Sequence, residues 1–171
     1  DSKSIGIQEY EYSLLAKECG IEMPERFLFE GKYFGVERFD RSIRGKLHVV
    51  SIAGLLCADY RIPGIDYLHI LQVCAELTHS IAELWKIYRL MVFNYLIGNK
   101  DDHAKNFSFI YRDEDWHFAP AYDILPSNGM YGFHTTSIND SITPTKEDLI
   151  AVATKAGLPS KEAEAIFNQI H

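Results

Sequence analysis

Apolar residues recur at helical spacing in some stretches of the chain and at alternate positions in others, and this change of period divides the sequence into elements. Helical spacing predicts helices over residues 8–19, 66–77 and 80–97. The last of these is apolar on both faces, so we expect it to be buried nearly all round. Capping residues predict two further helices, over 145–157 and from Ser160 onward.

Alternating polarity between turn residues predicts two β-hairpins. Strands are expected over 26–30 and 33–39, joined by a tight glycine turn, and over 107–112 and 116–119, joined by an acidic turn. Each strand is short and contains aromatic or β-branched residues, which is typical of strands with one buried face.

The remaining stretches are less regular. Residues 42–46 are polar and basic and predict a loop between lobes, and residues 126–144, rich in Gly, Ser, Asn and Thr, predict an ordered loop. The apolar run 47–60 is expected to be helical from about Ser51. The order is helix, hairpin, several helices, hairpin and helices again, which indicates an α+β fold.

Composition and charge narrow the class of protein. With 171 residues, 47% of them hydrophobic and 24% charged, the chain fits one globular domain or two lobes that share an interface. A net charge of −7 argues against a direct nucleic-acid surface, because phosphate contacts require clustered Lys and Arg. We expect neither a membrane span nor a secretion signal. The odd cysteine count (Cys19, Cys57 and Cys74) without paired spacing predicts free thiols in a reducing compartment, hence a cytoplasmic protein.

The densest polar stretch of the chain lies at residues 98–108, between an apolar helix and an apolar strand. Asp101 and Asn106 are separated by four residues, the spacing of a kinase catalytic loop, and Asp123 follows the next hairpin. In that chemistry one aspartate faces the substrate hydroxyl, and the asparagine and second aspartate hold a metal on the nucleotide phosphates. The structural alternative is that Asp101 and Asn106 only cap the helix or turn the chain after it. Because ATP would be repelled by so many carboxylates, a nucleotide here requires a divalent cation.

Two further residues of this stretch have open roles. His103 is either a general base or metal ligand, or a residue that buttresses the loop through a backbone hydrogen bond, and we favour the buttress. Lys105 either neutralises phosphate or pairs with Asp102 on the surface. The other histidines lack metal-ligand spacing, which makes a zinc site improbable.

A second group of candidate residues lies at 36–41, at the expected junction between lobes. Glu37 and Phe39 fall on one side of the predicted strand, as a pocket for an adenine requires: backbone groups face the base edge and an aromatic ring covers its face. An ordinary edge strand of alternating polarity explains the same pattern equally well.

Three ordered motifs together resemble the HipA-type toxin kinases of bacterial toxin–antitoxin modules. They are VERFDR at 36–41, GNKDDHAKNFS at 98–108 and APAYDIL at 119–125. The resemblance spans nearly the whole chain. It implies a protein-kinase-like α+β fold in which 1–41 is a remnant of the N-lobe with the hinge strand, and 42–171 is a mostly helical C-lobe with the catalytic loop and the metal-binding hairpin.

The resemblance also implies roles for individual residues in Ser/Thr phosphorylation with Mg²⁺ and ATP. By this match the catalytic group is Asp101 with His103 and Lys105, the metal ligands are Asn106 and Asp123, and the nucleotide pocket is lined by Glu37, Phe39, Asp40 and Tyr122. Glu9, in the pair Gln8-Glu9, is expected to face the ATP-binding lysine. The implied partners are a protein substrate of the aminoacyl-tRNA synthetase type and a helix-turn-helix antitoxin.

One departure from the family pattern keeps other hypotheses open. The Gly-rich phosphate loop and the ATP-binding lysine are expected upstream of Gln8, and residues 1–7 supply neither. This leaves a catalytically silent kinase-like binding module, or a fragment that needs its N-terminal segment, as alternatives. A metal-dependent phosphoesterase built on Asp101, Asp102 and His103 ranks behind both.

Overall fold

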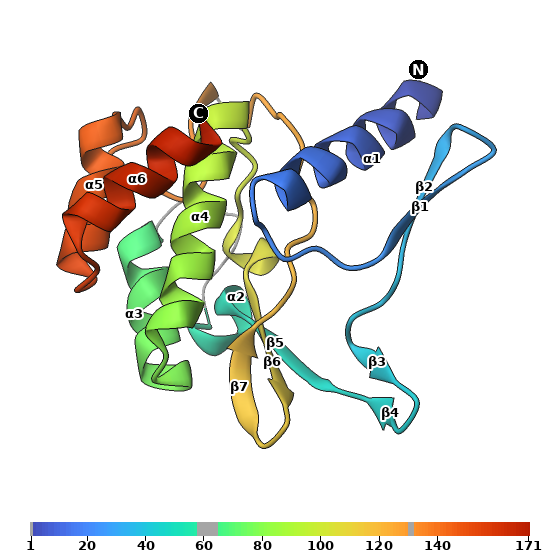
Figure 1. Cartoon of the computed structure of the whole chain (residues 1–171), viewed down its shortest axis with the longest axis horizontal. Helices are drawn as coiled ribbons and strands as arrows, with labels where there is room; N and C mark the ends of the chain where they lie inside the picture. The colour runs from blue at the N-terminus through green and yellow to red at the C-terminus, as the bar shows by residue number, and fades with distance from the viewer. Residues whose placement is uncertain (1, 58–64, 130–131) are drawn as a thin grey trace.

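The computed structural model describes residues 2–57, 65–129 and 132–171, with the side chains of 2–4 excepted. The helices of the C-terminal two thirds of the chain pack together at one end, and the N-terminal helix with the hairpin over residues 26–36 lies at the other (Figure 1). The helices are α1 (Ser2–Glu18), α2 (Ile52–Leu55), α3 (Tyr67–Thr78), α4 (Ile81–Ile97), α5 (Lys146–Lys155) and α6 (Ser160–Ile170), and η1 (Ala104–Asn106) is a 3₁₀ turn. This confirms the predicted α+β class.

The central helix of the core is α4. Its buried residues include Ile87, Tyr88 and Met91, each fully shielded from solvent, and α3 and α6 pack against it. Gly98 ends the helix with φ of 69°, a conformation that glycine adopts without strain. The prediction that this helix is buried nearly all round is wrong at its first turn, where Ile81 is 66% exposed.

A three-stranded antiparallel sheet lies beneath the helices, in the order β5–β6–β7. Strands β6 (Ser108–Arg112) and β7 (Asp115–Phe118) form the predicted second hairpin. The expected helix does begin after Ser51, which caps α2 at Ile52, but α2 ends at Leu55, and the residues before it form a third strand, β5 (His48–Ser51), that the sequence did not predict. Residues 58–60 of that expected helix lie outside the described part of the chain.

The N-terminal part consists of α1 and two hairpins. Strand β1 (Arg26–Phe29) pairs with β2 (Tyr33–Val36), which ends three residues earlier than predicted, and β3 (Arg41–Ser42) pairs with β4 (Gly45–Lys46) inside the expected loop. Helix α1 also starts at Ser2 instead of residue 8. It lies so close to β2 that a Cβ on Gly6 would stand 2.3 Å from the carbonyl oxygen of Lys32.

The long segment after β7 lies against the loop that follows α4. Ser127 N donates to Gly98 O at 3.1 Å, and Thr135 N donates to Lys100 O at 3.1 Å. Asp66, the N-cap of α3, accepts from Ser137 Oγ at 2.7 Å and thereby fixes the middle of the segment. Within the residues described, no helix has the length and apolarity needed to cross a bilayer.

Candidate active site

The candidate site is built on the loop from Gly98 to Asn106, between the end of α4 and the start of β6. The loop begins at the left-handed cap of α4 and ends in η1, whose last residue, Asn106, is buried. The side chain of Asn99 fixes the entry, because its Oδ1 accepts from Asp101 N at 3.2 Å. The helix end and the 3₁₀ turn therefore hold Asp101 between two ordered points.

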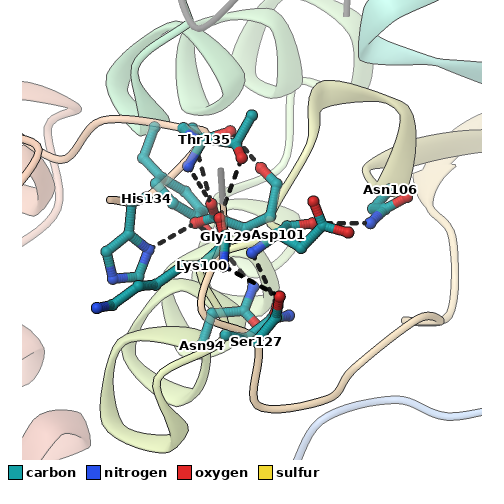
Figure 2. A network of polar contacts seen from close by, with 12 residues as sticks. Asn94, Lys100, Asp101, Asn106, Ser127, Gly129, His134 and Thr135 are labelled. Atoms are coloured by element: carbon teal, nitrogen blue, oxygen red, sulfur yellow. Dashed lines mark hydrogen bonds and ion pairs between the residues drawn. The ribbon is translucent and has the colours of Figure 1, made fainter. Parts of the chain in front are cut away.

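Asn106 and Asp123 converge from different elements, as the sequence predicts. Asn106 Nδ2 donates to Asp123 Oδ2 at 3.2 Å and to the carbonyl oxygen of Asp101 at 3.3 Å, the second of which is visible in Figure 2. Asp123 lies five residues after β7 with φ of 57°, a left-handed conformation that Asp tolerates better than most residues. The side chains of Asn106 and Asp123 are thus in direct contact, and Asp101 joins them through its backbone carbonyl.

The carboxylate of Asp101 is oriented by a histidine. His103 Nε2 lies 2.8 Å from Asp101 Oδ1, and the two side chains are 17% and 48% exposed. The partner of the imidazole is therefore the carboxylate and not a backbone carbonyl, which corrects the expected buttress. The half-exposed carboxylate combines a fixed direction with access from solvent.

Lys105 enters this region through its backbone. Its carbonyl oxygen accepts from the Tyr122 hydroxyl at 2.7 Å, while its side chain is exposed. The same hydroxyl lies 2.7 Å from Ser108 Oγ. Burial raises the pKa of Tyr122, so the phenol stays protonated and able to donate. Tyr122 consequently links the turn before β6 to the segment after β7, which contains Asp123.

A pocket of about 300 Å³ opens beside these residues. Its wall includes all four side chains predicted for nucleotide binding: Glu37, Phe39, Asp40 and Tyr122. The rings of Phe39 and Tyr122 are stacked, with centroids 5.8 Å apart and planes inclined by 28°. Asp40 makes a two-pronged contact with Arg38, at 2.9 and 2.7 Å, which holds the pKa of this carboxyl below its usual range.

Glu9 of α1 faces the same centre from the other side. It lines a cavity of about 70 Å³ together with Asp123 and Tyr122. Burial raises the pKa of Glu9, and the nearby negative charge of Asp123 raises it further. A cation placed between the two side chains would favour the ionised form of Glu9.

Asp102 is the residue whose role the sequence did not reveal. Its side chain is fully shielded from solvent and accepts hydrogen bonds from Tyr67, Thr135 and Thr136, with His134 Nδ1 at 3.2 Å. It therefore faces the interior, away from any substrate, which removes the geometric basis of a phosphoesterase site on this carboxylate. The described residues also contain no cluster of three or more His, Cys, Asp or Glu suited to hold a metal without other ligands.

Comparison with known proteins places these features in a family. The sequence matches the family described as HipA-like C-terminal domain over residues 1–171. A protein of Sinorhizobium fredii named "Putative kinase Y4dM" is 30% identical over 91% of this chain and 44% of its own length. A Haemophilus influenzae protein named "Putative kinase" is 29% identical over 68% of this chain and 40% of its own length.

Solved structures show the same fold. HipA of Shewanella oneidensis, determined in a toxin–antitoxin complex with HipB and operator DNA, superposes with a TM-score of 0.81 at 22% identity, over 96% of this chain and 46% of HipA. The Helicobacter pylori proinflammatory kinase CtkA superposes with a TM-score of 0.57 at 12% identity, over 96% of this chain and 81% of CtkA. The chain thus spans less than half of its curated relatives and has a kinase-like fold. It belongs to the HipA-like C-terminal domain family.

Proposed function

We propose that this chain is the catalytic part of a HipA-type kinase that transfers the γ-phosphate of ATP to a serine or threonine hydroxyl of a protein. The observation that carries the proposal is the position of Asn106, whose Nδ2 donates to the Asp123 carboxylate at 3.2 Å and to the backbone carbonyl oxygen of Asp101 at 3.3 Å. In the proposed division, residues 1–41 belong to the N-lobe and 42–171 to the C-lobe. As a toxin kinase it would act in the cytoplasm, on a protein substrate, and be neutralised by an antitoxin comparable to HipB.

Asp101 is the residue proposed to receive the substrate proton. Its carboxylate is half exposed, and the contact with His103 Nε2 at 2.8 Å limits its rotation. A hydroxyl placed against the free side of this carboxylate is oriented for attack and can deliver its proton there. Lys105 follows in the same loop, where an exposed ammonium suits the charge of a transferred phosphoryl group.

The donor set fits a magnesium ion. Asn106 Nδ2 is already engaged by two acceptors, so the amide oxygen is the atom left for a cation, and Asp123 adds carboxylate oxygens. One or two protein oxygens are sufficient because Mg²⁺ completes its shell with water and phosphate oxygens. When bound, the ion supplies charge neutralisation on the β- and γ-phosphates.

The pocket lined by Phe39 and Tyr122 is proposed to hold the adenine ring of ATP. Its volume, about 300 Å³, falls at the lower end of the range for small-molecule pockets, and its stacked aromatic wall suits a planar base. Glu37 and the carboxylate of Asp40, which Arg38 holds in place, are polar residues in its wall. Glu9 is proposed to pair with the ATP-binding lysine of the full-length kinase.

A transfer assay tests the proposal directly. The full-length protein is incubated with γ-labelled ATP and Mg²⁺, and label on serine or threonine of the kinase itself or of cytoplasmic protein is measured. We expect label that depends on Mg²⁺ and disappears with Asp123→Asn, while the matched variant Asp113→Asn, in the exposed turn between β6 and β7, keeps it. Label that is unaffected by Asp123→Asn contradicts the assigned site.

A silent binding module is the second candidate, favoured by the cavity beside Glu9, whose described lining residues include no lysine. The two functions differ in one measurement. Calorimetric titration of the full-length protein with ATP and Mg²⁺ gives binding in both cases. Binding without any transfer of label identifies the silent module.

A further inference from the structure

A buried polar network lies directly beneath the loop that carries Asp101, and Asp102 is its centre. Asp102 is 1% exposed, and both of its carboxylate oxygens accept two contacts each. Oδ1 accepts from Thr135 N and Thr136 N, each at 3.1 Å, and Oδ2 accepts from Tyr67 OH at 3.0 Å and lies 3.2 Å from His134 Nδ1. Because the partner is a carboxylate, Nδ1 of His134 carries the proton.

The hydroxyl groups of the same two threonines bind the backbone of the loop. Thr136 Oγ1 donates to the carbonyl oxygen of Asp102, and Thr135 Oγ1 donates to that of Lys100 at 3.0 Å. Gly129 allows the segment after β7 to lie close to Lys100, since a Cβ at this position would stand 2.9 Å from Lys100 O (Figure 2). The segment 134–136 is thus bonded to both neighbours of Asp101.

The network also reaches Asp101 from the helix side. Tyr67 OH, at the start of α3, accepts from Asn94 Nδ2 of α4 at 3.1 Å, and Asn94 Oδ1 accepts from Asn99 Nδ2 at 3.1 Å. Asn99 Oδ1 then accepts from Asp101 N at 3.2 Å. An unbroken chain of hydrogen bonds therefore runs from the Asp102 carboxylate through two helices back to the backbone of Asp101.

From this geometry we propose that Asp102 is a positioning residue, which acts through the backbone of Asp101 by binding the catalytic loop to segment 134–136 and to α3. The inference rests on the proposed kinase function for its effect on rate. An ionised carboxylate is the group that can satisfy four donors at once, and a neutral amide in its place would set an NH₂ group against some of them. The loop would then lose its fixed orientation while its surface groups remained.

The molecule offers a matched control in Asp66. It is also buried, at 5% exposed, and also binds the segment after β7, through Ser137 Oγ at 2.7 Å and Asp140 N at 2.8 Å. No hydrogen bond found among the described residues joins it to the loop 98–106. Asp66→Asn consequently disturbs the same part of the fold, while all four donors to Asp102 and every bond to the loop 98–106 remain in place.

The test compares Asp102→Asn, Asp66→Asn and wild type in the full-length protein, well below their melting temperatures. We expect both variants to have a lower melting temperature than wild type. Only Asp102→Asn should lower kcat, by about 10–100-fold, with KM for ATP within about twofold of wild type. Tyr67→Phe, which removes one of the four donors, should give a smaller loss of kcat. Equal losses of kcat in Asp102→Asn and Asp66→Asn overturn the proposal, as does wild-type kcat in Asp102→Asn.

A second readout does not require kinase activity. Amide hydrogen exchange at 100–106 should accelerate in Asp102→Asn and stay at the wild-type rate in Asp66→Asn. Unchanged exchange in Asp102→Asn contradicts the positioning role even if the protein proves to be no kinase. If exchange accelerates but wild type transfers no phosphate, the proposed function fails and the positioning of the loop stands.

Discussion

At the scale of single residues, the two adjacent aspartates of the loop have opposite surroundings. The Asp101 side chain is 48% exposed, whereas that of Asp102 is fully buried among donors. The sequence predicted a role for Asp101 from its spacing to Asn106, since that spacing reflects local geometry. It did not identify Asp102, because the donors from Tyr67 and His134 are more than thirty residues away along the chain.

Replacement of Glu9 is expected to increase stability and to decrease phosphate transfer. Its pKa is raised by burial and by Asp123, so folding disfavours its ionised form, and at neutral pH this costs stability that is recovered as the pH falls. We expect Glu9→Gln to raise the melting temperature at pH 7 and to lower phosphate transfer about tenfold or more, as loss of a supporting partner does. Thermal melts and the transfer assay measure the two effects.

Glu11→Gln is the control for this change, because Glu11 is an exposed carboxylate on the same helix. It should alter neither property. A melting temperature that falls in Glu9→Gln would show that the ionised carboxylate is already compensated within this chain.

At the scale of elements, the sequence predicted those with a strong period or clear caps. Helices α3 and α5 begin at the capping residues Asp66 and Thr145, and the β6–β7 hairpin has the expected acidic turn. It missed β5, because this strand is a short apolar run whose extended state depends on distant partners. Val49 and Val50 pair with Ile110 and Phe109, about sixty residues later. Short apolar runs fit a buried strand and a buried helix equally well.

The contact between α1 and the first hairpin depends on Gly6. Alanine at this position would favour the helix locally, by about 1 kcal/mol. Its Cβ would nevertheless stand 2.3 Å from Lys32 O, and the overlap should cost about 1–3 kcal/mol. We expect Gly6→Ala to destabilise the packing of α1 on β2, measured as faster hydrogen exchange at the Phe34 amide.

Gly54→Ala in α2 is the matched control, since the nearest atoms to its Cβ would be 3.5 Å away. It should leave exchange at Phe34 unchanged. Slower exchange in Gly6→Ala would mean that helix propensity outweighs the close contact.

A charged cluster joins α4 to the hairpin that leads to Asp123. Glu83 is 8% exposed in its side chain and accepts from Lys86 Nζ at 3.0 Å and from Phe118 N at 2.9 Å. Burial alone would raise the pKa of Glu83, but these hydrogen bonds and the charge of Lys86 outweigh it and hold the pKa below its ordinary value. The ionised carboxylate therefore contributes to stability at neutral pH.

The sign of the pH dependence follows from this lowered pKa. The stabilisation is present above about pH 4.5 and is lost as the pH falls through the folded-state pKa. We expect Glu83→Gln to lower the free energy of unfolding by about 1–3 kcal/mol at pH 7 and the gap to wild type to narrow in acid. Urea unfolding at pH 7 and in acid measures the difference in free energy of unfolding between the variant and wild type. The exposed Glu114→Gln is the control, and a difference that widens in acid contradicts the assignment.

At the scale of the whole molecule, the site lies where the N-terminal part meets the helices. Ala121 N donates to Glu22 O at 2.8 Å, and Arg89 of α4 donates to Cys19 O at 3.0 Å. These contacts bring α1, and with it Glu9, toward Asp123, while the β1–β2 hairpin stays beside α1 and lies away from helices α3–α6 (Figure 1). The net charge of −7 and the carboxylates at the junction suit a nucleotide that arrives with its cation.

The most direct test of the central claim measures phosphate transfer in single turnover with Asp101→Asn in the full-length protein, with ATP affinity determined on the same sample. The account predicts a loss of about 10²-fold or more in the transfer rate, with ATP affinity within about twofold of wild type, because this carboxylate acts on the substrate hydroxyl and not on the nucleotide. Transfer that stays within about tenfold of wild type contradicts it, because a positioned proton acceptor is worth more than that.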